Sequence, residues 1–312
     1  MKILVTGGAG FIGSHLIDRL LDEKHNVTCI DDLSLGKKEH IKHNLANPDF
    51  KFIKEDLLNF GKLSGIFKSA RFDCVFHLAA NSDIQLGNQI HRIDLDKNFL
   101  TTFNILECMS ASNTSQLVFA STSAIYGESD KKLAEDYGPL LPISFYGASK
   151  LAAEAYISVY SNNYGIKSWI FRFPNVVGER ATHGAIFDFI NKLRKNPKKL
   201  EVLGDGNQRK PYMYVRDLID GILFGQKKSN EVINYFNLGC SSNTSVSEIV
   251  KIVTHEMELE GVKIEYSGGD RGWIGDVPYF LYDLSKINNL GWKAKYNSTE
   301  AVRLAIRKML KK

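Results

Sequence analysis

Three consecutive hydroxyl residues end an apolar run in the stretch VFASTSAIYG, which covers residues 118–127. They are Ser121, Thr122 and Ser123. Two interpretations fit them: polar residues can lead a strand into a turn, or one hydroxyl can hydrogen-bond a reacting alcohol. The stretch alone does not decide between these interpretations, so the decision depends on what the rest of the chain places nearby.

A tyrosine and a lysine four residues apart, Tyr146 and Lys150, follow in the sequence YGASK. On a helix, positions i and i+4 share one face, so the lysine can stabilise a tyrosinate and also reach a ribose. The spacing alone is weak evidence, because Tyr282 and Lys286 have it too. Only the first pair follows a hydroxyl-ended strand and begins a long helical pattern. We therefore expect the first pair to be functional and the second to be structural.

A glycine-rich turn near the start of the chain indicates a phosphate site. The segment VTGGAGFIG places Gly7, Gly10 and Gly13 between the first apolar run and the first helical pattern. Glycine permits a tight turn and lets backbone N–H groups approach a pyrophosphate at a helix N-terminus. The second apolar run ends in Asp31 and Asp32, where a carboxylate can accept the ribose hydroxyls of adenosine and repel a 2′-phosphate. This context predicts a dinucleotide site for NAD rather than NADP.

A parallel sheet would bring these residues together, and the first half of the chain predicts one. Apolar runs alternate with helical patterns, which is typical of βαβ units. The strands are expected over 2–6, 26–31, 50–53, 73–78, 116–121 and 168–173, and the helices over 11–23, 91–112 and 145–164. The predicted fold class is α/β, a Rossmann doubly wound parallel sheet with a smaller C-terminal α/β substrate domain.

The pattern changes after about Phe173, where polar loops, a helix near 184–195, isolated strands and a last helix near 298–310 follow. The NAD-binding domain is expected over residues 1–173, and the nucleotide-sugar-binding domain over 174–211 and 241–312. The segment YMYVRDLIDGILFG (212–225) resembles a strand and a helix that return to the first domain, which places a return segment near 212–240.

The composition is that of an ordinary soluble protein. The 312 residues are 44% hydrophobic and 24% charged, with a net charge of +5. The lysines are scattered, which argues against nucleic acid as a partner. The four cysteines lie far apart without a C-x-x-C pair, so neither a metal site nor a disulfide framework is expected. Since no signal-peptide pattern and no apolar run of about 18 residues occurs, we expect a cytoplasmic protein with no membrane partner.

Together these motifs resemble the extended short-chain dehydrogenase/reductase superfamily and, within it, the nucleotide-sugar epimerase/dehydratase branch, in particular UDP-glucose 4-epimerase-like proteins. The resemblance rests on GGAGFIG (7–13), Asp31, HLAA (77–80), the Ser/Thr before YG, and the Tyr146/Lys150 pair. It continues through RFPNVVG (172–178), LGDGNQRKPYMYVRDL (203–218), FNLG (236–239), GWIGDVP (272–278) and LGW (290–292). It therefore covers nearly the whole chain.

The resemblance implies NAD as the cofactor and assigns residues to it along the ends of the predicted strands. These are Gly7, Gly10, Phe11 and Ile12 at the pyrophosphate, Asp31 at the adenosine ribose with Asp32 beside it, Asp56 and Leu57 flanking the adenine, Leu78, Ala79 and Ala80 over the cofactor, Asn98 as a buttress, and Tyr146 and Lys150. Leu78 to Ala80 are also compatible with plain core packing.

For the substrate, the resemblance implies a nucleotide sugar. Thr122 would bond the sugar O4, and Asn175 would bond the nucleotide sugar or serve as a turn residue. Phe280 falls at a position where, in the family, a bulky residue narrows the sugar pocket so that an N-acetyl group does not fit. A packing role unrelated to the substrate fits this residue as well.

The chain departs from the family pattern in two places, which together involve three residues. Lys210 and Pro211 stand where Arg-Asp is usual, so Lys210 can meet a phosphate only without the bidentate geometry of arginine. Arg271 lies further upstream of Gly275-Asp276 than the usual arginine, and it can either clamp the diphosphate or be solvated in a loop. UDP, GDP and CDP therefore stay open as the nucleotide.

The family mechanism assigns the chemistry to the residues quoted first. Tyr146 would take the proton of the sugar 4-hydroxyl while C4 gives hydride to NAD⁺, with Lys150 and the nicotinamide lowering the pKa of the phenol from near 10. Thr122 would support this proton transfer. Ser123 and Ala124 stand where 4,6-dehydratases have an Asp-Glu pair, so 4,6-dehydration is not expected.

The leading hypothesis is an NAD-dependent nucleotide-sugar 4-epimerase of the UDP-glucose 4-epimerase type. One alternative is a net NAD-dependent 4-dehydrogenase, for example on a GDP-linked sugar or heptose in surface-polysaccharide biosynthesis. Another is a non-catalytic NAD-binding regulator. The resemblance also implies a homodimer formed through the helices near 91–112 and 145–164.

Overall fold

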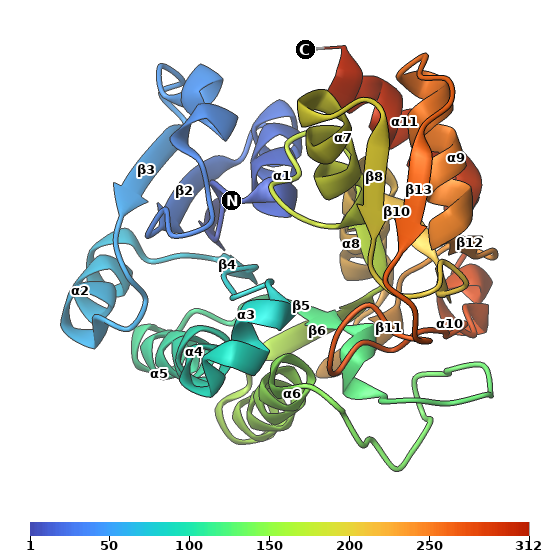
Figure 1. Cartoon of the computed structure of the whole chain (residues 1–312). Helices are drawn as coiled ribbons and strands as arrows, with labels where there is room; N and C mark the ends of the chain where they lie inside the picture. Colours follow the sequence, from blue (N-terminus) through green and yellow to red (C-terminus); the bar gives the residue numbers. More distant parts are fainter. Residues whose placement is uncertain (312) are drawn as a thin grey trace.

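A seven-stranded parallel sheet organises the N-terminal part of the protein, whose computed structural model describes residues 1–311 (Figure 1). The strand order is β11-β6-β5-β4-β1-β2-β3, and every pairing in it is parallel. The strands are β1 (Lys2–Thr6), β2 (Asn26–Asp31), β3 (Phe50–Lys54), β4 (Cys74–His77), β5 (Gln116–Thr122), β6 (Lys167–Phe173) and β11 (Ile233–Asn237). The predicted doubly wound parallel sheet is confirmed, with β11 as a seventh strand beyond the six expected from sequence.

Helices cover both faces of the sheet, which explains why its strands are almost continuously apolar. Alternate residues of a strand point to opposite faces: Ile3 and Val5 join a core with α1 (Phe11–Asp22) and α8 (Val215–Lys228). Leu4 joins the other core, with α2 (Phe60–Ala70), α5 (Thr101–Ser112) and α6 (Phe145–Tyr164). The order in which strands are added to the sheet reverses between β1 and β4: β2 and β3 lie on one side of β1, and β4, β5, β6 and β11 lie on the other. At such a point the carboxyl ends of the two strands border a crevice.

The segment before α5 differs from the single helix predicted over 91–112. It consists of α3 (Ile84–Gln89), α4 (His91–Asp94) and a π-helical segment, Leu95–Leu100, which leads into α5. The wider π-helical turns change which residues face the sheet edge, and such segments are frequent at functional sites. Asn98 is completely buried there and donates to Asp94 Oδ1 at 3.0 Å. The prediction of one regular α-helix is therefore wrong at this point.

The C-terminal elements gather around a core of their own, at the right of Figure 1. Its helices are α7 (Ala185–Lys195), α9 (Val246–Glu256) and α11 (Ser298–Leu310), whereas the short α10 (Ser285–Asn289), between α9 and α11 in the chain, contributes Ile287 to the N-terminal core. Three two-stranded sheets accompany them: β7 (Asn175–Val177) with β10 (Tyr212–Tyr214), β8 (Lys199–Val202) with β13 (Lys263–Tyr266), and β9 (Arg209–Lys210) with β12 (Thr244–Ser245). Ser245 and Asn297 start α9 and α11 with capping boxes.

The segment 212–240 connects the two cores. β10 pairs with β7 outside the large sheet, whereas α8 packs on α1 and β11 pairs with β6. The helix and the last strand of this segment thus contact the N-terminal core. We keep the division into 1–173 with this return segment, and 174–211 with 241–312, as a proposal.

Two further observations concern the described residues as a whole. No helix within residues 1–311 has the length and apolar character needed to cross a membrane. Over the same range, no group of three or more His, Cys, Asp or Glu side chains has the arrangement of a metal site. The four cysteines are buried and free.

Candidate active site

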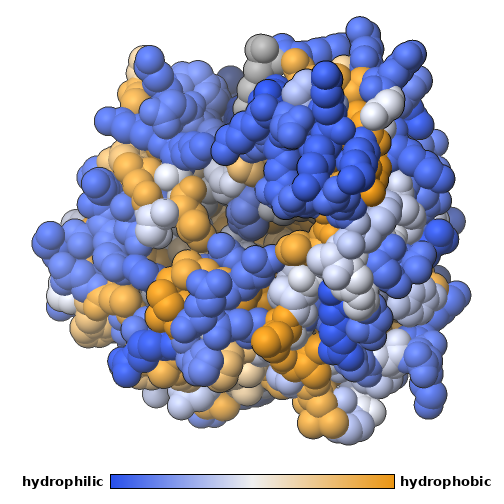
Figure 2. Space-filling view, viewed as in Figure 1, coloured by the Kyte–Doolittle hydropathy of each residue, from blue (hydrophilic) through white to orange (hydrophobic). Residues whose placement is uncertain are grey.

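A cavity of about 1000 Å³ lies where the carboxyl ends of the central strands face the C-terminal elements. Figure 2 shows the molecule hollowed near the centre of this face. The predicted site residues that line the cavity are Gly7, Gly10, Phe11, Ile12, Asp31, Asp32, Asp56, Leu57, Leu78, Ala79, Ala80, Thr122, Tyr146, Lys150, Asn175, Lys210 and Phe280. Asn98 and Arg271 do not line it. The volume and the mixed lining suit a large ligand with polar groups.

The glycine turn fits a pyrophosphate. Gly7 has a φ of +67°, and a Cβ added there would lie 2.7 Å from the backbone of Ala79. Gly10 is the N-cap of α1 and supplies no side-chain cap, so the first N–H groups of the helix remain available to an anion. The turn therefore presents backbone donors and helix-dipole charge to the cavity, as a dinucleotide requires.

The carboxylates of Asp31 and Asp32, at the end of β2, also line the cavity. Asp31 accepts hydrogen bonds from Ala9 N at 2.9 Å and from Leu33 N at 2.8 Å, and its burial raises its pKa. Burial also acts on Asp32, but hydrogen bonds from Lys97 and Ser34 outweigh it and lower the pKa of Asp32. The Asp32 carboxylate is thus ionised at neutral pH.

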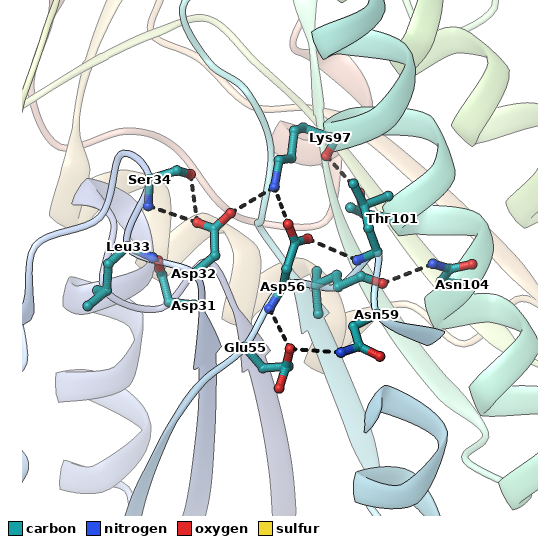
Figure 3. Close-up of polar contacts among 12 residues, drawn as sticks. Asp31, Asp32, Leu33, Ser34, Glu55, Asp56, Asn59, Lys97, Thr101 and Asn104 are labelled. Carbon is teal, nitrogen blue, oxygen red and sulfur yellow. Dashed lines mark hydrogen bonds and ion pairs between the residues drawn. The ribbon is translucent and has the colours of Figure 1, made fainter. Parts of the chain in front are cut away.

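Lys97 is a cavity residue that the sequence analysis missed (Figure 3). Its Nζ donates to Asp32 Oδ2 at 2.8 Å and to Asp56 Oδ2 at 2.7 Å. The two carboxylates outweigh the effect of burial and raise the pKa of Lys97. Helical periodicity could not indicate this residue, because Lys97 belongs to the π-helical segment.

Asn98, the neighbour of Lys97, lies behind the cavity wall. Its Oδ1 accepts from Asn81 N at 2.7 Å, and its Nδ2 donates to Ser149 Oγ at 3.1 Å. The side chain therefore ties the loop after β4 to α6, next to Lys150. This position is compatible with the buttressing role expected for it.

Tyr146 is placed by the start of α6, where Ser144 caps the helix by accepting from Gly147 N at 3.1 Å. The Tyr146 phenol is hydrogen-bonded to the Thr122 side chain, but burial dominates and raises the pKa of Tyr146 to about 12. Lys150 Nζ donates to Ala120 O at 2.9 Å, and burial lowers the pKa of Lys150 to about 7. The expected low tyrosine pKa is thus not a property of the protein alone, because desolvation, together with the charge of Asp94, outweighs the interaction with Thr122.

Two of the three consecutive hydroxyls, Ser121 and Thr122, lie at the end of β5 and have different partners. Thr122 is bonded to Tyr146 and also accepts from Ala124 N at 3.1 Å. Ser121 donates to the carboxylate of Glu154, which is paired with Arg172 at 2.8 Å. Of the three, Thr122 is therefore the hydroxyl that is joined to the candidate base, and Ser121 belongs to a buried ionic network.

The second Tyr-x-x-x-Lys match has a different environment. Tyr282 precedes α10 and donates to Phe173 O at 3.1 Å. Lys286 Nζ lies 3.8 Å from the centre of the Tyr235 ring. The two residues do not share a helix, and neither lines the cavity, which agrees with a structural role.

The far end of the cavity is formed by the C-terminal elements. Asn175 is hydrogen-bonded to the Tyr212 side chain, and Phe280 is 3% exposed and packs edge-on to Tyr282 at 5.4 Å between ring centres. Two buried polar groups at this end, the Gln208 amide and Trp273 Nε1, have no hydrogen-bond partner within residues 1–311. Both side chains line the cavity and can serve a polar ligand.

The two candidate phosphate ligands are already paired. Lys210 forms an ion pair with Asp276, which is 4% exposed, and lies 5.2 Å from the centre of the Trp273 ring. Arg271 pairs with Glu128 at 2.8 Å and lies outside the cavity lining. The guanidinium of Arg271 is directed to Glu128, and the diphosphate clamp by Arg271 stays a prediction beside its alternative, an arginine solvated in a loop.

Comparison with known proteins agrees with this geometry. A model of the NAD dependent epimerase/dehydratase family matches residues 3–239. A putative UDP-glucose 4-epimerase of Methanocaldococcus jannaschii is 36% identical over 310 residues, which are 97% of each chain.

Two solved structures share the fold over all of this chain and 99% of theirs. The UDP-glucose 4-epimerase of Thermotoga maritima with UDP-glucose has a TM-score of 0.90 at 30% identity. The UDP-glucuronic acid 4-epimerase of Bacillus cereus in complex with UDP-glucuronic acid and NAD has a TM-score of 0.90 at 28% identity. The glycine turn, the acidic end of β2 and the Thr122–Tyr146 pair thus occur in a chain that belongs to the NAD-dependent epimerase/dehydratase family.

Proposed function

We propose that this protein is an NAD-dependent nucleotide-sugar 4-epimerase. The observation that carries the proposal is the hydrogen bond between Thr122 and Tyr146 inside the cavity, because it joins a candidate base to a hydroxyl that can hold the reacting alcohol. Two solved 4-epimerases of UDP-linked sugars and the putative UDP-glucose 4-epimerase named above support this reaction and a UDP-sugar as the substrate.

The proposed cofactor site follows the N-terminal strands. The glycine turn holds the pyrophosphate, Asp31 and Asp32 lie at the adenosine ribose, and Asp56 with Leu57 flanks the adenine. Leu78 to Ala80 cover the cofactor, with Asn98 behind them. Bound NAD supplies a reversible hydride acceptor at the sugar C4.

Tyr146 and Thr122 carry out the proton transfer at the sugar 4-hydroxyl. Because the phenol has a pKa of about 12 in the protein alone, it becomes a base only when positive charge comes close to it. Lys150, one helical turn further along α6, and the cationic form of the cofactor carry that charge. Thr122 keeps the sugar oxygen within reach of Tyr146, so the same pair can remove the proton and return it.

A net 4-dehydrogenase is the second candidate, and one observation favours it. An epimerase must hold its keto sugar firmly at the nucleotide, yet Lys210 is paired with Asp276 and Arg271 with Glu128 at the proposed phosphate end. A weaker hold on the nucleotide would favour release of the ketone. A non-catalytic regulator is disfavoured, because Tyr146, Lys150 and Thr122 are all present at the cavity.

One experiment separates these functions. The purified protein is mixed with UDP-glucose or UDP-glucuronic acid and no added oxidant, and both the sugar and the absorbance of NADH are followed. We expect a steady mixture of C4 epimers without net NADH and without a 4-keto-6-deoxy product, since Ser123 and Ala124 offer no acid–base pair for dehydration. A stoichiometric burst of NADH with a released 4-keto sugar would instead assign a dehydrogenase, and no sugar turnover with any nucleotide sugar would contradict both.

The proposed assembly is a cytoplasmic homodimer. On α6, Tyr156 and Val159 are 43% and 52% exposed, and the Tyr156 ring packs edge-on against Phe99 and Phe103. This strip of large apolar side chains gives a second copy a surface to bury. Sedimentation of a monomer at micromolar concentration would contradict the dimer.

A further inference from the structure

The ammonium of Lys97 joins two carboxylates that come from different strand ends. Asp32 directly follows β2, Asp56 lies just beyond β3, and Lys97 reaches both from the π-helical segment that follows α4 (Figure 3). Lys97, Asp32 and Asp56 all line the cavity. The charged bridge formed by Asp32, Lys97 and Asp56 is therefore part of the cavity wall, as Asp31 is.

Both carboxylates are also held on their other oxygen. Asp32 Oδ1 accepts from Ser34 N at 2.8 Å and from Ser34 Oγ at 2.6 Å. Asp56 Oδ1 accepts from Leu58 N at 2.9 Å. Each carboxylate is thus oriented by its own loop and presents its second oxygen to Lys97, so the ammonium lies in a prepared position. An ammonium has three N–H donors, and these two bonds use two of them.

The balance of charge at this end explains which dinucleotide it accepts. Asp31, Asp32 and Asp56 supply three negative charges against the single positive charge of Lys97, a sum of −2 when all four are ionised. A ribose 2′-phosphate would bring further negative charge next to Asp32. The positive charge of Lys97 is meanwhile taken up by Asp32 and Asp56, so it does not offset that repulsion.

We propose that Lys97 determines cofactor specificity together with Asp32: the bridge holds Asp32 in place for the ribose hydroxyls of NAD, and Lys97 becomes a ligand for a 2′-phosphate once Asp32 is removed. This proposal rests on the placement of adenosine at Asp31 and Asp32 given above. The ligand class is a 2′-phosphorylated dinucleotide, which a free ammonium at this position recognises by charge-assisted hydrogen bonds.

The test uses a double-mutant cycle on the full-length protein with Asp32→Ser, Lys97→Met and the two combined. Each variant is equilibrated with equal concentrations of NAD⁺ and NADP⁺, separated from free nucleotide, and its bound nucleotides are quantified by chromatography. This readout measures binding and needs no turnover. Lys62→Met is the matched control, because Lys62 pairs with the nearby Glu55 at 3.0 Å and does not line the cavity.

We expect Asp32→Ser to raise the bound NADP/NAD ratio by about tenfold or more, the size of one charge-assisted hydrogen bond together with relief of repulsion. Lys97→Met alone should lower NAD occupancy without raising NADP, because Asp32 and Asp56 then repel each other. The combined variant should lose the NADP gain of Asp32→Ser. The control should bind as the wild type does.

An equal NADP/NAD ratio in Asp32→Ser and in the combined variant would overturn the proposal, since Lys97 would then contribute nothing to the phosphate. If Lys97→Met fails to fold, as judged by its thermal unfolding, Lys97→Gln replaces it in the cycle with the same expected outcomes. A wild type that binds neither nucleotide would contradict the proposed cofactor site itself, which is a different result from the loss of coupling between Asp32 and Lys97.

Discussion

The side chains of Thr122, at the end of β5, and Tyr146, in the first turn of α6, are joined by a hydrogen bond. The bond fixes the phenol at the edge of the cavity, where a sugar hydroxyl can meet both groups. If Tyr146 is the proton acceptor, the reaction depends on its phenolic oxygen and not on the rest of the ring.

Tyr146→Phe should therefore lower kcat by about 10²-fold or more while NAD stays bound, because general-base catalysis contributes on that order. Epimer formation and nucleotide content of the purified variant are the measurements. Tyr282→Phe is the matched control: it removes a buried hydroxyl that donates to Phe173 O, and because Tyr282 itself does not line the cavity, turnover should stay near the wild-type rate. Turnover that survives in Tyr146→Phe would assign the base to another group.

Lys150 predicts a dependence of stability on pH. Burial lowers its pKa from the ordinary 10.5 to about 7 in the folded protein. Between these values the unfolded chain binds a proton that the folded chain does not, so the free energy of unfolding rises with pH there, by up to about 1.4 kcal/mol per pH unit from this group. Below about pH 7 both states are protonated and the contribution is constant.

The measurement is urea unfolding of the wild type and of Lys150→Met at pH 7.5, 8.5 and 9.5. The wild type should gain stability relative to Lys150→Met as the pH rises through this window. Lys62→Met, which removes an exposed lysine, should change in parallel with the wild type. Parallel curves for Lys150→Met would mean that Lys150 keeps an ordinary pKa.

Much of the fold was predictable because it depends on local patterns. Apolar runs bounded by turns gave six strands of the large sheet, and the glycine turn marked the start of α1. Asp31 and Tyr146 could be assigned to the cavity because each occupies a fixed place after a strand or at a helix start.

What could not be predicted depends on contacts between distant segments. The bridge from Lys97 to Asp32 and Asp56 needs a π-helical turn, and an α-helical pattern does not indicate one. The pairing of Lys210 with Asp276 likewise joins β9 to the loop between β13 and α10. Desolvation, which keeps the Tyr146 phenol protonated, depends on how tightly the whole site packs.

The buried pair of Arg172 and Glu154 predicts a large loss of stability when it is broken. Their side chains are 7% and 8% exposed, and Arg172 also donates to Tyr126 Oη at 2.7 Å. Arg172→Met would leave the Glu154 carboxylate buried beside Ser121 without its partner, which costs about 3–5 kcal/mol in comparable cases.

Denaturant unfolding measures this loss. Arg172→Met combined with Glu154→Leu should recover a large part of the stability, since no unpaired charge then remains in the core. Arg92→Met, in the exposed pair with Asp96, should cost less than about 1 kcal/mol. A similar small cost for Arg172→Met would show that Glu154 is readily neutralised or solvated.

Phe280 predicts the size of the sugar that the cavity accepts. Its ring is nearly inaccessible, lines the cavity and packs edge-on against Tyr282. An N-acetyl group at the sugar C2 needs space that this ring would occupy, so the wild type should turn over UDP-glucose with a higher kcat/KM than UDP-N-acetylglucosamine.

Phe280→Ala should shift this preference toward the N-acetylated sugar while costing about 3–5 kcal/mol of stability through the cavity that it leaves. Phe280→Tyr keeps the bulk of the ring and serves as the matched control for size, with the preference of the wild type retained. The measurement is kcat/KM for both sugars with each variant, at a temperature where all of them are folded. Efficient turnover of UDP-N-acetylglucosamine by the wild type would show that the ring does not limit the pocket. An unchanged ratio in Phe280→Ala would place the C2 substituent away from Phe280, so that the residue would serve packing alone.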